Sequence, residues 1–184
     1  MYESHVTVNC DKDEFIKICS DNKLKSVIIA NDTGSHLKNQ QMTASFHKVK
    51  TYQEAYDQMI SISKLFSNVI RMKLEKIVGK KTVIDFKYKY KEFHSKFKIN
   101  KSQEIEFLDI IKKGFGNTSI NLIKGDNFRF FTTRDEELHN KTLPLLMDKF
   151  EYLGSIREVV VYDDNESIDS NYICKDCPLK KYAI

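Results

Sequence analysis

The chain has 184 residues, of which 41% are hydrophobic, with 12 Phe and 9 Tyr, and this composition is typical of a folded protein rather than a disordered one. Thirty basic residues stand against 26 acidic ones, and the net charge of +4 gives no indication of a surface for duplex nucleic acid. No apolar run approaches the ~20 residues that cross a bilayer, and the N-terminus lacks the features of a signal peptide. We therefore expect a cytoplasmic protein that binds no membrane.

A short motif near the N-terminus occurs twice. Glu3-Ser-His5-Val-Thr7 recurs 89 residues later as Glu92-Phe-His94-Ser-Lys96. The chain has only 5 histidines, so two of them in the same local frame indicate one structural unit present in two copies. Side chains two residues apart lie on the same face of a strand, so each copy places a carboxylate and an imidazole side by side.

The remaining elements also follow the same order in both halves. The first half predicts strand, helix, strand, strand, helix and strand at residues 3–8, 13–20, 26–29, 42–45, 52–66 and 69–75. The second half predicts the same order at residues 92–96, 103–113, 119–122, 131–134, 138–152 and 156–162. Gly154 follows the last helical pattern and is expected to cap that helix.

This order is that of the ferredoxin-like β-α-β-β-α-β unit, in which two helices cover one face of an antiparallel sheet. The expected fold is therefore α+β, a tandem duplication whose sheets form a pseudo-twofold barrel or sandwich. Repeat 1 spans residues 1–78, a linker entering repeat 2 spans 79–90, repeat 2 spans 91–166, and a tail with a Cys-x-x-Cys pair spans 167–184. The sequence leaves open whether the repeats close into one barrel or lie side by side.

The alternation along the strands separates an apolar face, expected under the helices, from a polar face. In the third strand this puts Met42, Ala44 and Phe46 under the helices. The polar face then consists of Glu3, His5, Thr7, Thr43, Ser45, His47, Arg71, Lys73 and Glu75 in the first half, and of Glu92, His94, Lys96, Thr132 and Arg134 in the second. The last strand does not alternate cleanly, so either Arg157 or the pair Glu158 and Tyr162 faces the same side.

Such a face fits a wet cavity, because buried charges are costly unless they are paired. Arginine and lysine hold phosphate oxygens, histidine transfers protons near neutral pH, and a neighbouring glutamate orients the imidazole. We therefore predict His5 and His94 as catalytic residues, oriented by Glu3 and Glu92. The predicted ligand-binding residues are Thr7, Thr43, Ser45, His47, Arg71, Lys73, Glu75, Lys96, Thr132, Arg134, Glu158 and Tyr162. The alternative is a solvated face with cross-strand ion pairs.

The other cysteines and histidines give weaker predictions. Cys174 and Cys177 form one Cys-x-x-Cys pair without a second pair, so the sequence predicts no metal ligands, although distant residues or a second subunit could complete a metal or redox site. Cofactors stay unspecified, and a divalent metal is not indicated. His36 and His139 fall outside the repeat and are expected in loops or on the surface.

Three resemblances arise at these residues. His5-Val-Thr7 resembles the H-x-T signature of 2H phosphoesterases, in which each His acts as acid or base and each Thr or Ser binds phosphate; Lys96 stands where a second Thr belongs. Glu92-Phe-His94-Ser-Lys96 and Arg71-Met-Lys73-Leu-Glu75 resemble the strands of triphosphate tunnel enzymes, which hold a metal with E-x-E-x-K, although His94 replaces a Glu. The order of motifs over most of the chain is similar to a duplicated family of uncharacterised proteins.

The sequence therefore predicts a pocket that handles a phosphoester or nucleotide, with His5 and His94 transferring protons in hydrolysis. Its expected partner is an anionic small molecule or a nucleotide. Two alternatives stay open: a module that binds a small molecule or nucleotide without turning it over, and an interaction scaffold.

Overall fold

The computed structural model describes residues 1–31, 39–79, 82–113, 116–123 and 127–169. These residues form an α+β structure with the strands β1 (Tyr2–Val8), β2 (Ser26–Asn31), β3 (Asn39–Thr43), β4 (Ser45–His47), β5 (Val69–Val78), β6 (Tyr90–Lys98), β7 (Asn117–Asn121), β8 (Phe128–Thr133) and β9 (Glu151–Asp163). The α-helices are α1 (Lys12–Asp21), α2 (Tyr52–Ser63), α3 (Glu104–Lys113) and α4 (Glu136–Met147). Two 3-10 helices are η1 (Lys101–Gln103) and η2 (Glu166–Asp169).

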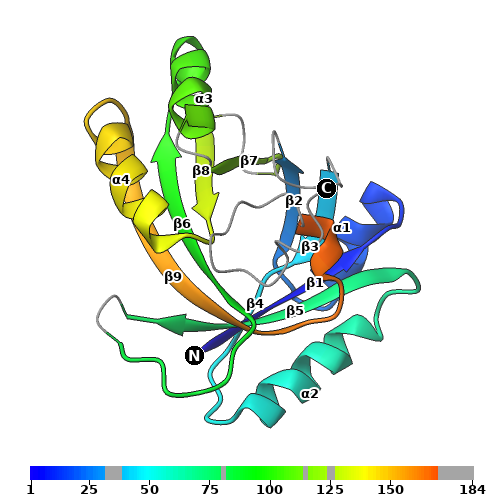
Figure 1. Cartoon of the computed structure of the whole chain (residues 1–184). Coiled ribbons are helices and arrows are strands. Elements are labelled where there is room, and N and C mark those ends of the chain that lie inside the picture. The colour runs from blue at the N-terminus through cyan, green and yellow to red at the C-terminus, as the bar shows by residue number, and fades with distance from the viewer. Residues whose placement is uncertain (32–38, 80–81, 114–115, 124–126, 170–184) are drawn as a thin grey trace.

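The strands form one antiparallel sheet that closes on itself. The order is β3-β2-β7-β8-β6-β9-β5-β1-β4, and β3 also pairs with β1, so eight strands complete a barrel and β4 lies against β1 (Figure 1). The pairs β2–β7 and β5–β9 join strands from the first half of the chain to strands from the second. Closure removes exposed sheet edges and separates an interior from an outer surface. The structure thus decides the open question in favour of a barrel.

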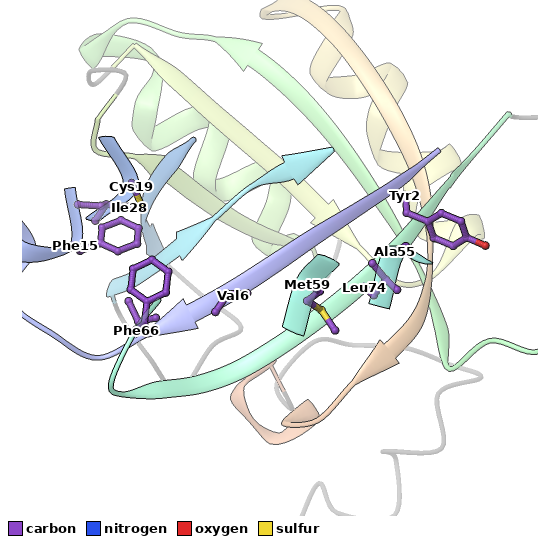
Figure 2. Packing of buried hydrophobic residues seen from close by; sticks show 10 residues of the cluster. Tyr2, Val6, Phe15, Cys19, Ile28, Ala55, Met59, Phe66 and Leu74 are labelled. Carbon is purple, nitrogen blue, oxygen red and sulfur yellow. The ribbon is translucent and has the colours of Figure 1, made fainter. Parts of the chain in front are cut away.

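The helices cover the outside of the barrel. In Figure 1, α3 and α4 flank β6 and β8, while α1 and α2 lie against the other half. A core of Phe15, Ala55 and Met59 from α1 and α2 packs on Val6 and Leu74 of the strands, as Figure 2 shows. The alternating apolar side chains of these strands therefore point outward to the helices, and the polar ones point into the barrel.

A second core lies under α3 and α4. Phe97 of β6 contacts Phe107 of α3 with ring centroids 5.5 Å apart, and Phe107 contacts Phe150 at 5.2 Å. Phe131 and Leu146 complete this fully buried cluster. Truncation of such aromatic side chains to Ala costs about 3–5 kcal/mol, so each cluster holds its pair of helices firmly on the barrel.

Local capping groups set where the helices begin. The side chain of Asp11 accepts hydrogen bonds from the backbone of Asp13 and Glu14 at the start of α1. Thr51 and Glu54 form a reciprocal capping box at the start of α2. Asp135 accepts from the backbone N–H of Leu138 in α4. These residues satisfy N–H groups that have no partner inside the helix.

The last helix and strand differ from the prediction. The helix expected over residues 138–152 begins at Glu136 and ends at Met147, and β9 begins at Glu151 because it pairs there with Lys98. Gly154 is not a helix cap. It lies in β9 with a φ of 140° beside a register shift, where a bulge favours glycine.

His139 also differs from its expected surface position. It lies on α4, 7% exposed, and its ring stacks near Phe93 and Phe131 with centroid distances of 5.2 and 5.8 Å. Its Nε2 is 2.9 Å from the hydroxyl oxygen of Ser95. The sequence analysis counted only apolar residues as core residues of this helix. It therefore missed His139, whose ring packs in a mainly aromatic core and presents a polar edge there.

The predictions for the remaining cysteines, for one histidine and for the linker concern residues that are wholly or partly outside the described ranges. His36, Cys174 and Cys177 lie outside the described ranges. The strands on either side of the expected linker, β5 and β6, end at Val78 and begin at Tyr90. No helix in the described ranges is long and apolar enough to cross a membrane.

Candidate functional site

The barrel interior contains a cavity of about 320 Å³. The predicted polar face accounts for much of its lining: Glu3, His5, Thr7, Arg71, Lys73, Glu75, Glu92, His94, Lys96, Thr132 and Glu158 all contribute. These residues come from β1, β5, β6, β8 and β9, which lie side by side in the barrel. The sequence therefore identified most of the charged wall of the cavity.

The third strand faces the other way from its prediction. Thr43, Ser45 and His47 do not line the cavity. The hydroxyl oxygen of Thr43 accepts a hydrogen bond from the backbone of Val6. His47 lies 2.6 Å from the side-chain oxygen of Gln58 on α2, and burial lowers the pKa of its imidazole. These side chains thus belong to the layer between barrel and helices.

The apolar residues of that segment point inward instead. Met42 pairs with Thr7 and Phe46 pairs with Glu3 across antiparallel strands. Directly opposed residues share a face of the sheet, so Met42, Ala44 and Phe46 line the cavity with the polar residues of β1. The prediction was wrong because it assigned every apolar residue to the helix-covered core.

The cavity also has an apolar wall that the sequence analysis missed. Val27 and Ile29 of β2, Phe130 of β8 and Ile156 of β9 line it together with Met42. Only the register of the closed barrel reveals this wall, because the same residue types also form the outer cores. The cavity therefore has both charged and apolar groups. Val27, Ile29 and Phe130 lie across the barrel from the strand that carries Lys73, with polar side chains such as Gln40 and Asn121 among them.

In the last strand, Glu158 faces the cavity and Tyr162 does not. A register shift pairs Tyr162 with Leu74 and Val160 with Glu75, so Val161 is an extra residue in β9. Such a bulge reverses the facing of every residue beyond it. Tyr162 consequently packs outside the barrel against Tyr56 of α2, with ring centroids 5.1 Å apart.

His5 belongs to the first of two histidine–carboxylate groups. Its Nδ1 is 3.1 Å from the backbone carbonyl of Thr43, which can only accept, and its Nε2 is 2.9 Å from Oε2 of Glu75. Glu3 lies 3.8 Å away. Burial works to lower the pKa of His5, but the Glu75 carboxylate raises it above its ordinary value. Both ring nitrogens are thus placed to donate, as in an imidazolium ion.

His94 belongs to the second group. Its Nε2 lies 3.1 Å from Glu158 and 3.3 Å from Glu92, and its Nδ1 lies 2.9 Å from the hydroxyl oxygen of Thr132. Burial opposes the charged ring, yet hydrogen bonds to the two carboxylates raise the pKa of His94 to about 10. At neutral pH this histidine carries a positive charge.

Lys73 connects the two groups. Its ammonium lies 2.7 Å from Oε1 of Glu75 and 3.0 Å from Oε2 of Glu92. Although burial raises the pKa of a carboxyl, Lys73 and the adjacent histidines hold the pKa of Glu75 at about 2 and that of Glu92 well below its usual range. A continuous chain of charged contacts therefore runs from His5 to His94.

Two of the predicted cations are already held by acids. Arg71 donates to Asp163 at 3.0 and 2.6 Å and to Asp169 at 2.5 Å. Arg134, which does not line the cavity, donates two hydrogen bonds to Glu92 at 3.1 and 3.0 Å. The sequence analysis missed both aspartates, because Asp163 follows a bulge in β9 that places it on the face of Lys73, and Asp169 reaches the barrel only through η2.

Three side chains have a geometry that a metal ion accepts. Ligand atoms of Glu75, His94 and Glu158 lie within 4.8 Å of one another. Each of these groups already has a partner of opposite charge, since Lys73 contacts Glu75 and His94 contacts Glu158. A metal would have to displace a proton or an ammonium group to bind here.

No family model matches this chain, and no curated protein matches it. Three solved structures align over most of their length. One is described as an anthrone oxidase-like protein, with 8% identity, coverage of 88% of this chain and 91% of the other, and a TM-score of 0.29. Proteins described as "Putative monooxygenase" come from Fusobacterium nucleatum (13% identity, 87% and 90% coverage, TM-score 0.29) and Lactobacillus acidophilus (10% identity, 87% and 92% coverage, TM-score 0.31). Likeness at this level says nothing about the reaction of this chain.

The predicted resemblances and the predicted phosphoester function are wrong. No model of the 2H phosphoesterases, of the triphosphate tunnel enzymes or of a duplicated uncharacterised family matches. The geometry gives a physical reason, because Arg71 and Lys73 already bind carboxylates. Cations neutralised in this way are poor ligands for a phosphate.

Proposed function

We propose that the barrel interior binds a small organic molecule with an apolar body and a carbonyl or hydroxyl oxygen at one end. The charged wall would then stabilise negative charge on that oxygen. The observation that carries the proposal is the position of Lys73, whose ammonium lies between the two histidine–carboxylate groups and lines a cavity with an apolar opposite wall.

The two walls support a ligand of mixed polarity. Small-molecule sites are mostly apolar with a few converging polar groups, and their volumes begin at roughly 300 Å³. The cavity of about 320 Å³ has this character, with Val27, Ile29 and Phe130 on one side and Lys73 on the other. The apolar body would lie against the first three residues.

The charge balance favours a neutral ligand. In the charged wall His5 pairs with Glu75, Lys73 pairs with Glu75 and Glu92, His94 pairs with Glu158, and Arg71 pairs with Asp169, so most of its charges are balanced by a partner. A ligand that enters with a full charge would upset this balance in a buried site. A neutral ligand that develops charge only at one oxygen would be stabilised by donors fixed in advance.

His5 and His94 would act as fixed positive charges beside the ligand, with Glu75 and Glu158 setting their orientation. Thr7, Lys96 and Thr132 would complete the polar contacts, since all three line the cavity. Lys96 lies over the ring of Phe128, 4.2 Å from its centroid, so its charge is shared with an aromatic face.

We also infer that residues 1–78 and 91–166 are ferredoxin-like repeats joined by the linker 79–90. The strand orders β2-β3-β1-β5 and β7-β8-β6-β9 support this, as do the equivalent pairs Glu3–Glu75 and Glu92–Glu158. A circular permutant opened at the exposed Val83 is expected to retain the circular dichroism spectrum of the natural chain. Loss of the fold in that permutant would contradict the boundary.

The binding proposal is tested with two neutral probes, 2-tetralone and 2-naphthol, and with inorganic phosphate. We expect both organic probes to raise the melting temperature and shift cavity resonances in NMR spectra, and phosphate to have no effect. Ala44→Trp fills the cavity and should abolish the effect, and Ile156→Trp, at a more exposed lining position, should weaken it.

Val83→Trp serves as the matched control, because Val83 is 84% exposed and does not line the cavity. It should respond to the probes as the natural chain does. The proposal fails if neither organic probe binds, or if the folded Ala44→Trp and Ile156→Trp variants bind them as well as the control does.

A further inference from the structure

We propose that Glu3 is the proton acceptor of this cavity and that Lys73 donates to the oxygen of the same ligand. The site would thus remove a proton from a carbon atom next to a carbonyl group. This inference rests on the proposed function and adds a reaction class to it. It follows from two of the differences between the two halves of the charged wall.

The first difference is the residue opposite each glutamate. Arg134 follows Thr133, which pairs with Phe93, and its guanidinium donates to Glu92. At the matching place in the first half, Glu3 pairs with Phe46, which has no charge. Glu92 is thereby fixed as a carboxylate. Glu3 instead faces an aromatic ring with the ammonium of Lys25 5.6 Å from its centroid, and among the described residues only His5 lies within ion-pair distance of Glu3.

Glu3 has few other partners. Among the described residues, its carboxyl group makes one ion pair, to His5 at 3.8 Å, while Glu92 contacts Lys73 at 3.0 Å, Arg134 at 3.0 Å and His94 at 3.3 Å. Glu3 is only 7% exposed and lines the cavity. Its oxygens are therefore open to a ligand rather than consumed by the protein.

The electrostatics of Glu3 agree with a proton-accepting role. Burial raises the pKa of its carboxyl; Glu158 and Glu75 act in the same direction, and His5 and Lys25 act against them. Its neighbours Glu75 and Glu92 have lowered pKa values instead. A base becomes more effective as its pKa approaches the working pH, and divergent pKa values in one site separate the acid and base roles.

The second difference is the presence of Lys73. It pairs with His5 on β1, and the matching residue opposite His94 is Ile156. An ammonium group has three N–H donors, and in the described structure Glu75 and Glu92 engage two of them. The third is available to a ligand oxygen in the cavity.

Glu3 and Lys73 both belong to the first half of the chain, and together they define one candidate reaction site. Glu3 and Lys73 lie on adjacent strands as diagonal neighbours, because Glu3 pairs with Glu75 and His5 with Lys73. Diagonal positions are roughly 7–8 Å apart, within reach of long side chains. A carbonyl group and its adjacent carbon fit between a carboxylate and an ammonium at such a separation.

The proton transfer balances without another reactant. The Glu3 carboxylate takes the proton, the electrons of the broken C–H bond form a carbon–carbon double bond, and the carbonyl electron pair moves onto oxygen. The resulting enolate oxygen accepts a hydrogen bond from Lys73. The Glu3 carboxylic acid exchanges its proton for deuterium from the solvent and then delivers the deuteron to carbon, so the net change in heavy water is exchange of hydrogen for deuterium.

The test measures deuterium incorporation into 2-tetralone in heavy water by proton NMR, beside the binding measurements above. The natural chain is expected to accelerate exchange over buffer, and Glu3→Gln to lose about 100-fold or more of that rate while still binding the probe. Lys73→Met should also slow exchange. Glu151→Gln, a change at a residue with a 57% exposed side chain, is the matched control and should leave the rate unchanged.

A second variant separates chemistry from folding. Phe46→Arg, at a position 50% exposed, would place a cation opposite Glu3, as Arg134 lies opposite Glu92. It should lower the pH at which exchange begins and reduce the rate at neutral pH, because a more acidic carboxyl is a weaker base. An unchanged pH profile would contradict the assignment.

The outcomes distinguish the two proposals. If 2-tetralone and 2-naphthol do not bind, the proposed function fails. If 2-tetralone binds but the natural chain does not accelerate exchange, or Glu3→Gln exchanges at the natural rate, the role of Glu3 is overturned while the binding function stands.

Discussion

Arg134 holds Glu92 from the inner side of the barrel, with Nε and one terminal nitrogen donating to the same carboxylate oxygen at 3.1 and 3.0 Å. The guanidinium also lies 3.8 Å from the ring centroid of Tyr90. Both charged groups are almost completely buried. The pair thus ties β6 to the end of β8 through a buried, charged contact.

Removing this cation is expected to destabilise the fold. Arg134→Leu should lower the free energy of unfolding by about 3 kcal/mol, because it leaves a buried carboxylate with one partner fewer. Urea denaturation measures the change. Combining it with Glu92→Gln should recover part of the loss, whereas Lys98→Ala, which breaks an exposed ion pair with Glu151, should cost less than about 1 kcal/mol. A cost for Arg134→Leu as small as that of Lys98→Ala would contradict this account.

Stability should depend on pH through His94. The folded pKa of about 10 lies above the ordinary value of 6.5, so the imidazolium contributes stability that is complete below pH 6.5 and is lost as the pH rises through about 10. His94→Gln should therefore be less stable than the natural chain at pH 6, by about 1.5–3 kcal/mol for a lost charged hydrogen bond. The difference should shrink towards pH 10 in urea denaturation.

His47 provides the matched comparison, because burial lowers the pKa of its imidazole. Its neutral form is favoured in the fold, so its contribution is present above pH 6.5 and falls as the solution becomes more acidic. The stability difference between His47→Gln and the natural chain should thus change with pH in the opposite direction. The same pH trend for both variants would contradict the two assignments.

Acid should weaken the fold through Glu75. Its folded pKa of about 2 lies below the ordinary value of 4.5, so the carboxylate contributes stability that is present above pH 4.5 and is lost as the pH falls through about 2. Glu75→Gln should therefore be less stable than the natural chain at pH 6, and the difference should shrink towards pH 2. A difference that is constant over this range, measured by thermal unfolding, would show that Glu75 does not act through its charge.

Gly116 is expected to tolerate no side chain. A methyl group added there would overlap the ring of Phe131, which is fully buried under α3 and α4. Gly116→Ala should cost about 1–3 kcal/mol through overpacking. Gly79→Ala, whose added methyl would meet only the flexible side chain of Thr82, is the control and should change urea stability much less.

Much of the charged wall was predictable from the sequence because alternation in a strand is a local property. Glu3 and His5 of β1, and Glu92 and His94 of β6, share a face in any extended conformation. The repeated motif identified them without knowledge of the sheet. The element order was predictable for the same reason, since caps and apolar spacing act within a few residues.

Register was not predictable in the same way. The sequence alignment matched Thr43 with Thr132, but the pairs Glu3–Phe46 and Thr7–Met42 bring Ala44 opposite His5, while Thr132 lies opposite His94. The alignment is therefore one residue out of step at β3. A slip of one residue exchanges the two faces of a strand. The polar Thr43, Ser45 and His47 were assigned to the cavity because the apolar residues of that strand were assigned to the helix-covered core, and only the register of the barrel shows the reverse.

The sequence by itself determined the order of the helices and strands and that two glutamate–histidine pairs lie on polar strand faces, because these properties depend on neighbours along the chain. Only the tertiary structure decided that the sheet closes into a barrel, that Phe46 faces Glu3, and that Lys73 joins the two histidine groups. Those features depend on bulges and on pairings between strands far apart in the chain. A single inserted residue such as Val161 reverses which face of the sheet the following side chains occupy.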